Sequence, residues 1–402
     1  MISSTNFSLL AYTKEQDFGS IPTLSETSYP RYLRYTSESF TYDRAKEASQ
    51  ELGSRTDAAV FEISAASTGN VGTEVSYMEY DPLIESLLQG SWTKYASSGT
   101  GVIGVAVFTV SSISGTFDTT TLKAGQFFTI AASGTANDGK VFRAATVASS
   151  LVTLDASTPA VAGTGAATTA VTSSRLVNGN TQSSFTFERQ NIDTREYWAY
   201  TGMTPSKMDL QVSARELSSL SFEFVGKGLN KLAMQTNLDE VPVPPWDFEI
   251  HTGATAGHFW FDGIKSNPDL HVRSVSLSYD NTLRDQYALG SLHPIGYGSG
   301  TITIQGTLEV YFSNAVLYNN YLSNEGVELT FATYDTKGNG YVITLPKIVF
   351  TNYGANAASK DDELILKLEF FALAVDGEAI QIDRLGQELV IRDWYQYYTF
   401  PL

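Results

Sequence analysis

The side chains that most often catalyse reactions or bind metals are sparse in this sequence of 402 residues. It contains four histidines (His251, His258, His271 and His293) and no cysteine. His251 and His258 lie in a glycine- and alanine-rich stretch, and their separation does not fit the spacing of metal ligands on a helix. The lack of cysteine excludes disulfides, thiol catalysis and cysteine-based metal sites, and it suits assembly in a reducing compartment. We therefore expect ordinary hydrogen-bonded histidines, no metal site and no cofactor.

Acidic residues are the most abundant reactive groups, with 43 carboxylates against 26 basic side chains and a formal net charge of −17. Paired carboxylates can hydrolyse glycosidic bonds, but no stretch concentrates acids and aromatic residues as a sugar-binding cleft would need. The motifs GxxxxGK(S/T), HExxH and GxSxG do not occur in the sequence. The negative charge repels phosphate and disfavours specific binding of nucleic acid. We therefore favour a non-enzymatic protein with no catalytic site, and keep a glycosidase as an alternative.

A strand followed by a helix occurs twice and is the most informative pattern in the chain. The first copy is Tyr77–Trp92 (YMEYDPLIESLLQGSW) and the second is Tyr311–Glu325 (YFSNAVLYNNYLSNE). Leucines recur on one face of the first helix, and Asp81 is expected to cap its N-terminus. At an offset of 234 residues the matched pairs are Gly72 with Gly306, Thr73 with Thr307 and Tyr77 with Tyr311.

The strands around these two helices repeat in the same order. Each copy reads as a strand, a long loop, a second strand, the helix, a hairpin and a final strand. The matched segments are Thr36–Asp43 with Arg273–Asp280, Ser184–Gly202 with Val327–Leu345, and Leu220–Gly226 with Leu366–Ala372. Unrelated β-rich segments could alternate similarly, but the shared order favours an internal duplication. We predict a mainly β protein with two tandem β-sandwich or β-barrel domains, each with a flanking α-helix.

A segment of different composition interrupts the first copy at residues 93–183. It is rich in small residues and carries three acids and five bases, so its net charge is +2 while the remainder of the chain carries −19. Short strands separated by glycine turns predict a small inserted β-barrel or sandwich that decorates the surface. The expected organisation is an N-terminal arm (1–35), a first domain (36–92 and 184–239), the insert (93–183), a proline-rich linker (240–250), a second domain (251–384) and a tail (385–402).

The two ends of the chain differ in composition. The first residues lack the basic flank and apolar stretch of a signal peptide, and no run of eighteen apolar residues occurs, so we expect no contact with a membrane. The C-terminus is dense in aromatic rings that must be buried somewhere. They are expected to dock either on their own domain or on a neighbouring copy, with the candidates Trp394, Tyr395, Tyr397, Tyr398 and Phe400.

Several phrases of the sequence resemble a known family. These are TSESFTYDR, YDPLIESLLQGSW, SARELSSLSFEFVGKG, LRDQYALGSLHPIGYGSGTITIQGTLEVYF and EAIQIDRLG. Together they resemble the major tail tube proteins of long-tailed, non-contractile bacteriophages, the siphophages, over most of residues 28–386. The phrase LKAGQFFTIAASGTANDGKVFRAATVASSLVTLDAS resembles small β domains inserted in such proteins.

The resemblance implies a structural virion protein of the phage tail, assembled in the bacterial cytoplasm. In that family, tube domains join edge to edge into rings whose inner sheets form a wide barrel, and the rings stack into a tube that carries DNA without binding it specifically. Two domains per chain imply a trimeric, pseudo-hexameric ring. Tail terminator and tail-tip proteins are the implied partners at the ends of the tube. A β-rich surface adhesion or carbohydrate-binding module, using the many tyrosines, is the alternative.

The resemblance also suggests where contact surfaces lie. Alternation along the pore-lining strands gives lumen-facing candidates, namely Glu74, Ser76, Thr301, Thr303, Gln305 and Glu309. Inter-ring contacts are expected in the loops at 44–70 and 281–300, whose alternative is plain disorder. Their candidates are Arg44, Glu47, Glu51, Arg55, Arg284, Asp285, Tyr287, His293 and Tyr297.

Overall fold

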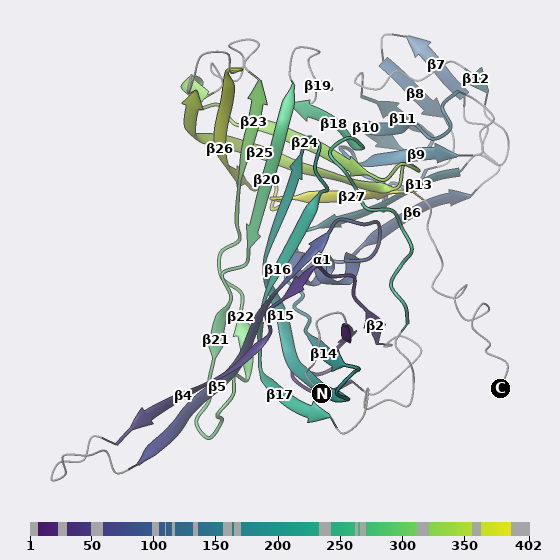
Figure 1. Ribbon diagram of the computed structural model, residues 1–402. Helices are drawn as coiled ribbons and strands as arrows, with labels where there is room; N and C mark the ends of the chain where they lie inside the picture. Colours follow the sequence, from purple (N-terminus) through teal and green to yellow (C-terminus); the bar gives the residue numbers. More distant parts are fainter. Residues whose placement is uncertain are drawn as a thin grey trace, which may run out of the picture.

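The computed structural model confirms a mainly β protein built from large antiparallel sheets (Figure 1). It describes residues 7–22, 30–49, 59–98, 104–108, 110–114, 117–131, 136–155, 163–164, 170–232, 243–261, 264–265, 271–311, 321–355 and 363–386. Within these ranges, the elements fall into one long inner sheet, two outer sheets and a smaller β unit.

The inner sheet contains strands from both halves of the chain. From edge to edge it runs β4 (Thr41–Ala48, preceded by β3, Ser37–Glu38), β5 (Val60–Glu74), β16 (Ser219–Gly226), β15 (Glu196–Ser213), β20 (Val272–Asp280), β23 (Thr303–Tyr311), β26 (Ile365–Leu373) and β25 (Gly340–Ala355). Every neighbouring pair is antiparallel. Pairing of β15 with β20 therefore joins the first set of four strands to the second.

Alternating side chains give this sheet one apolar and one polar face. In β16, Leu220, Phe222 and Phe224 are buried, whereas Ser221 and Glu223 between them are partly exposed. Successive residues of a strand point to opposite faces, so this pattern buries one face only. The apolar face packs into a main core shared by both sets of strands.

Two long strands, β15 and β25, leave the inner sheet and continue into separate outer sheets. The first outer sheet consists of β2 (Arg31–Tyr32), β1 (Ser8–Lys14), β14 (Phe185–Asn191), β15 and β17 (Gly228–Leu232). The second consists of β19 (Ile264–Lys265), β18 (Ala256–Phe261), β24 (Val327–Tyr334), β25 and β27 (Gln381–Leu385). Strand β1 comes from residues 1–35, the segment expected to form an N-terminal arm. It instead pairs with β14 along its whole length.

Matching irregularities support the internal duplication. Both β15 and β25 contain a bulge where they pair with the next strand in sequence, β16 or β26. The bulges are at Ser206 and at Thr351. The two bulge hydroxyls make the same bond: Ser206 Oγ donates to the Glu223 carbonyl at 3.1 Å and Thr351 Oγ1 to the Glu369 carbonyl at 3.3 Å. A bulge re-aims a strand at a defined position. We refer to the two sets, each with its outer sheet, as the first and second repeats.

The register corrects the offset expected from the sequence. Phe40 lies opposite Gly69 if the pairing of β4 with β5 is extended, and Leu277 lies opposite Gly306. The glycine equivalent to Gly306 is therefore Gly69, at an offset of 237 residues, and the pairing of Gly72 with Gly306 at 234 is wrong. A Cβ at Gly69 would approach the Phe40 ring to 2.2 Å, which explains why a glycine is needed there.

Helix α1 (Asp81–Leu88) occupies the expected place after β5, although its cap differs from the prediction. Tyr80 is the N-cap residue and makes no side-chain cap bond, while Asp81 lies inside the first turn. Asp81 instead pairs with Arg384 of β27 and accepts a hydrogen bond from Tyr341 of β25 at 2.5 Å. Asp81 therefore forms a buried ion pair with Arg384 of the second repeat and does not cap the helix. In the second repeat, helical residues are described at 321–323.

The insert forms strands of its own and is attached to the second repeat. Its strands are β6 (Thr93–Ser98), β7 (Gly104–Phe108), β8 (Val110–Ser114), β9 (Phe127–Ala131), β10 (Val141–Ala148), β11 (Leu151–Leu154), β12 (Gly163–Thr164) and β13 (Ala170–Val177). They enclose a separate small core. Strand β13 pairs antiparallel with β27, so the insert continues the second outer sheet (Figure 1).

Candidate functional site

The polar face of the inner sheet runs across the described strands of both repeats, and the exposed Phe371 and Leu373 interrupt it near one edge. The strand registers bring Glu223, Asp209, Ser278, Gln305 and Glu369 onto this face. A groove of about 540 Å³ follows it across both repeats. Most residues that line the groove are serines, threonines, glutamines and carboxylates, with Phe371 and parts of core leucines among them.

Carboxylates outnumber ammonium groups on this face. Among the described strands, the registers place on it the acids Asp43, Glu74, Asp209, Glu223, Asp280, Glu309 and Glu369, and the lysines Lys207, Lys347 and Lys367. Lys207 Nζ lies 3.0 Å from Asp209 and 3.3 Å from Glu223. The hydrogen bond to Asp209 raises the pKa of Lys207, so this lysine remains charged and neutralises part of the face.

The candidates expected to face a lumen divide between this face and the interior. Glu74, Thr303, Gln305 and Glu309 lie on the polar face by register, and Thr301 is exposed just before β23. Ser76 does not belong to the face, because it is only 1 % exposed and its backbone bridges to Ile250 beyond the end of β5. The alternation rule failed there because the strand had already ended.

Both edges of the inner sheet are unpaired in the described part of the chain. Strands β3 and β4 pair only with β5 on one side. At the opposite edge, residues 349–355 of β25 pair only with β26. Unpaired strand edges present rows of backbone donors and acceptors that another strand can complete. These edges are therefore the candidate site for pairing with another strand.

A projecting arm extends from one end of the sheet. It consists of the β4–β5 hairpin with β21 (Arg284–Gln286) and β22 (Gly296–Gly298) beside it (Figure 1). The Ala65 N–H donates to the Leu292 carbonyl at 2.9 Å, and His293 Nδ1 lies 3.1 Å from the Ala65 carbonyl oxygen. The described parts of the two loops expected to make inter-ring contacts thus bond to each other within the chain.

The inter-ring candidates have two different roles in the arm. Exposed members are Arg44, Glu47, Arg284, Asp285 and Tyr287. His293 joins the two loops of the arm through Ala65. Tyr297 holds the arm to the body, since it is 6 % exposed and its hydroxyl donates to the Gly226 carbonyl at 2.8 Å. Glu51 and Arg55 lie outside the described residues, as do Trp394, Tyr395, Tyr397, Tyr398 and Phe400.

Apolar side chains exposed on the arm were not anticipated from the sequence. Val60, Phe61 and Ile63 on β5 are 61 %, 60 % and 57 % exposed, and Leu289 and Ile295 on the neighbouring loop are fully and half exposed. Large exposed apolar patches are a common feature of interaction surfaces, so this cluster is a candidate for one. The apolar run VFEI at residues 60–63 is apparent in the sequence, but the sequence alone does not show that it lies outside the core.

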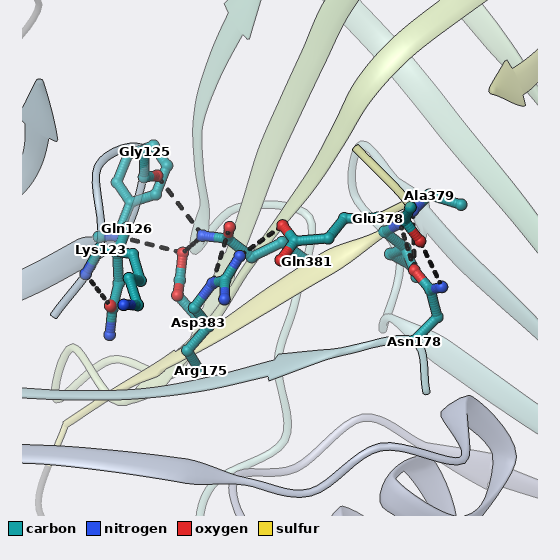
Figure 2. A network of polar contacts seen from close by, with 12 residues as sticks. Lys123, Gly125, Gln126, Arg175, Asn178, Glu378, Ala379, Gln381 and Asp383 are labelled. Carbon is teal, nitrogen blue, oxygen red and sulfur yellow. Dashed lines mark hydrogen bonds and ion pairs between the residues drawn. The ribbon is translucent and has the colours of Figure 1, made fainter. Parts of the chain in front are cut away.

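A buried polar network holds the insert against the second repeat (Figure 2). Asp383 Oδ2 accepts hydrogen bonds from the Phe127 N–H at 3.1 Å and from Gln381 Nε2 at 2.6 Å. Arg175 of β13 donates to Gln381 at 3.0 Å and pairs with Glu378 at 2.5 Å. Burial raises the pKa of Asp383 to about 7.

Neighbouring contacts strengthen this attachment of the insert. Arg143 pairs with Glu328 of β24 at 2.7 Å. Phe127 packs against Trp260, with ring centroids 5.0 Å apart, in a cluster that joins the insert to the second outer sheet. The insert is therefore fixed to the second repeat as well as being connected in sequence to the first.

The described residues also bear on the expectations for histidine and metal sites. No group of three or more histidine or acidic residues could hold a metal ion within these ranges. His251 is buried, contacts Thr333 Oγ1 at 3.0 Å, and has a pKa lowered to about 4 by desolvation. No helix in the described part of the chain is long and apolar enough to cross a membrane.

Comparison with known proteins identifies a family. A family model described as phage tail tube protein matches residues 5–379, which is nearly the whole chain. A search of curated proteins finds no match.

Proposed function

The chain belongs to the phage tail tube protein family and is a structural component of the virion tail, and we propose that three copies close into a pseudo-hexameric ring. In this proposal each repeat acts as one tail tube domain, and rings stack into the tube of a siphophage. Tail terminator and tail-tip proteins bind the two ends of that tube, which assembles in the bacterial cytoplasm.

The observation that carries the proposal is the eight-stranded inner sheet, whose two edges have no partner strand among the described residues. One set of four strands already meets a second set edge to edge within the chain, through β15 and β20. Three chains joined in the same way would supply six such sets. A closed sheet leaves no unpaired edge, which removes the main route to uncontrolled aggregation.

The polar face of the inner sheet is the proposed lining of the lumen. The opposite face packs into the core, so a closed ring would present the polar face to its bore. The described strands of each chain contribute seven carboxylates and three lysines to that lining, which makes it negative. Repulsion between this surface and DNA phosphates lets the genome slide through instead of adhering.

The projecting arm is the proposed contact between successive rings. Its exposed Val60, Phe61 and Ile63 would lose contact with water when they pack against a neighbouring ring. Burial of apolar surface contributes roughly 25 cal/mol per Å², so these side chains favour stacking. The exposed charges Arg44 and Arg284 would lie at the rim of that contact.

Electron microscopy of the purified full-length chain tests the proposal. We expect hollow rods at high protein concentration, and rings whose mass equals three chains of 43.8 kDa at lower concentration. Replacing both Phe61 and Ile63 by serine is expected to stop stacking while rings persist. A chain that stays monomeric at every protein and salt concentration would exclude the proposed assembly.

A further inference from the structure

We propose that neighbouring chains associate by repeating the joint between β15 and β20, in one defined register. Residues 351–354 of β25 in one copy pair antiparallel with residues 41–44 of β4 in a second copy, and Asn352 lies opposite Asp43. The proposal rests on the ring assembly proposed above and specifies the residues that meet in it.

The joint inside the chain supplies the template. Its register places Lys207 opposite Asp280 and Asp209 opposite Ser278. The Asn281 N–H donates to the Ser206 carbonyl at 3.0 Å, which fixes the hydrogen-bonding phase of the strands. Antiparallel pairs alternate between hydrogen-bonded and non-hydrogen-bonded types. Residues 207 and 209 therefore belong to the non-hydrogen-bonded type.

The duplicated bulge transfers this register to β25. Ser206 corresponds to Thr351, since both hydroxyls bond to the carbonyl of an equivalent glutamate. Counting from the bulge, Lys207 corresponds to Asn352 and Asp209 to Gly354.

The other edge follows from the pairing of β4 with β5. The offset of 237 residues relates Asp280 to Asp43 and Ser278 to Thr41. Placing the equivalent residues opposite each other pairs Asn352 with Asp43 and Gly354 with Thr41. An asparagine amide can donate to the opposing carboxylate, so the pair remains complementary although Lys207 has no basic equivalent.

Side chains at the free edges have the exposure expected of an incomplete joint. Met208 and Tyr279, opposite each other inside the chain, are 2 % and 0 % exposed. Their equivalents Tyr353 and Tyr42 are only partly buried. Joining two copies in the proposed register would bring these two rings opposite each other and cover both.

Local hydrogen bonds satisfy edge donors while the second copy is absent. Tyr353 is equivalent to Met208 and belongs to the hydrogen-bonded type of pair, so its N–H points to the open edge. This N–H donates to Oδ1 of the neighbouring Asn352 at 2.9 Å. On the other edge, the Phe40 N–H donates to Glu38 Oε2 at 3.0 Å, and the Phe40 carbonyl accepts from Arg189 at 3.0 Å. The bonds at Phe40 end the joint there, so we expect it to be shorter than the internal one.

Cysteine pairs placed in the full-length chain test the register. The protein has no cysteine, so each introduced thiol has one possible partner type. In a non-hydrogen-bonded pair the Cα atoms lie about 4.5 Å apart, which a disulfide can span. After oxidation of assembled material, Asp43→Cys with Asn352→Cys is expected to link most chains into covalent oligomers ending at the trimer on a non-reducing gel.

A second in-register pair and matched controls make the result decisive. Thr41→Cys with Gly354→Cys is expected to link equally well, and a Cβ at Gly354 meets no atom closer than 3.9 Å. Thr41→Cys with Asn352→Cys is shifted by two residues, where Cα atoms are roughly 7–8 Å apart, and should link few chains. Asp209→Cys with Ser278→Cys copies the geometry inside the chain and should oxidise without any change in oligomer mass.

The outcomes separate this register from the proposed function. Preferential linking of the shifted pair overturns the register. So does oxidation of the internal pair without linking of either in-register pair, provided that rings are visible by microscopy. If the unsubstituted chain forms no rings at all, the assembly itself is wrong and the register is overturned with it.

Discussion

The two outer sheets share a strand order but differ in what covers their last strand. Counting from the matched pair Phe187 and Phe331, the registers make Lys231 of β17 equivalent to Arg384 of β27. The Lys231 side chain is 64 % exposed and pairs with Glu196 at 2.6 Å. The Arg384 side chain is 13 % exposed and pairs with Asp81. Two basic residues at equivalent positions of the repeats thus differ: one forms a solvent-exposed ion pair and the other a buried one.

The neighbouring position shows the same divergence. Asn230 of β17 is exposed, whereas its equivalent Asp383 is fully buried beneath the insert. Strand β13 pairs with β27, but no described strand pairs with the corresponding edge of β17. The comparison indicates that the insert, contributed by the first repeat, creates a buried polar environment on the second.

Removing the buried cation should give the largest difference between the two sheets. Arg384→Met leaves the Asp81 carboxylate buried without its ion-pair partner, so we expect a loss of about 3–5 kcal/mol in the free energy of unfolding. Lys231→Met breaks only a surface pair and should cost about 0–1 kcal/mol. Urea unfolding of the unassembled chain measures both.

A double variant distinguishes the buried charge from lost packing. Arg384→Met combined with Asp81→Asn removes both charges, and it should recover part of the stability lost by Arg384→Met alone. Equal losses for Arg384→Met and Lys231→Met would contradict the comparison.

Loss of apolar packing around the last strand should give a smaller difference in stability between the two sheets. Two equivalent leucines test this. Leu385, 1 % exposed, belongs to the cluster containing Phe127 and Trp260, while Leu232, 7 % exposed, packs with Tyr197 and Ala199. Buried leucine-to-alanine changes cost roughly 2–5 kcal/mol, and we expect about 4 for Leu385→Ala and about 2 for Leu232→Ala.

Hydrogen exchange locates the effect of these two substitutions. Amides of β13 and β27 should lose protection in Leu385→Ala, because the insert detaches from the second sheet more often. They should keep it in Leu232→Ala. Loss of protection in both variants would mean that the insert does not depend on this cluster.

The pH dependence of stability should give the smallest difference. The pKa of Asp383 is raised by burial to about 7, so the folded chain binds more protons than the unfolded chain between the ordinary pKa of an aspartate, about 3.9, and pH 7. Stability therefore decreases as pH rises through this window. Asp383→Asn, which introduces the residue found at 230, should remove that decrease and stabilise the chain at pH 8 by on the order of 1–3 kcal/mol.

A matched change checks the source of this pH dependence. Asn230→Asp puts a carboxylate at the exposed equivalent position, where it should change the pH profile little because solvent hydrates both of its forms. If Asp383→Asn kept the pH dependence of stability of the unsubstituted chain, other groups would be responsible for the decrease.

Several features of the fold were predictable from short stretches of sequence. Alternation in SLSFEF and SVSLSYD indicated half-buried strands, and Asp81-Pro82 marked the start of a helix. The correct register was not predictable, because the repeated Gly-Thr at Gly72 and Gly306 suggested an offset that strand pairing corrects by three residues. A shift of three residues assigns every side chain of a strand to the opposite face, and the hydrogen-bonded partners show which offset holds.

By itself, the sequence determined the mainly β class, the duplicated order of elements and the polar character of one strand face, because these follow from local periodicity. Only the tertiary structure decided which equivalent residues are buried. Asp383 and Asn230 lie in similar local strands, yet their environments differ because β13, some two hundred residues away from β27 along the chain, pairs beside Asp383 alone. Burial and electrostatic role depend on such distant contacts, which no local pattern encodes.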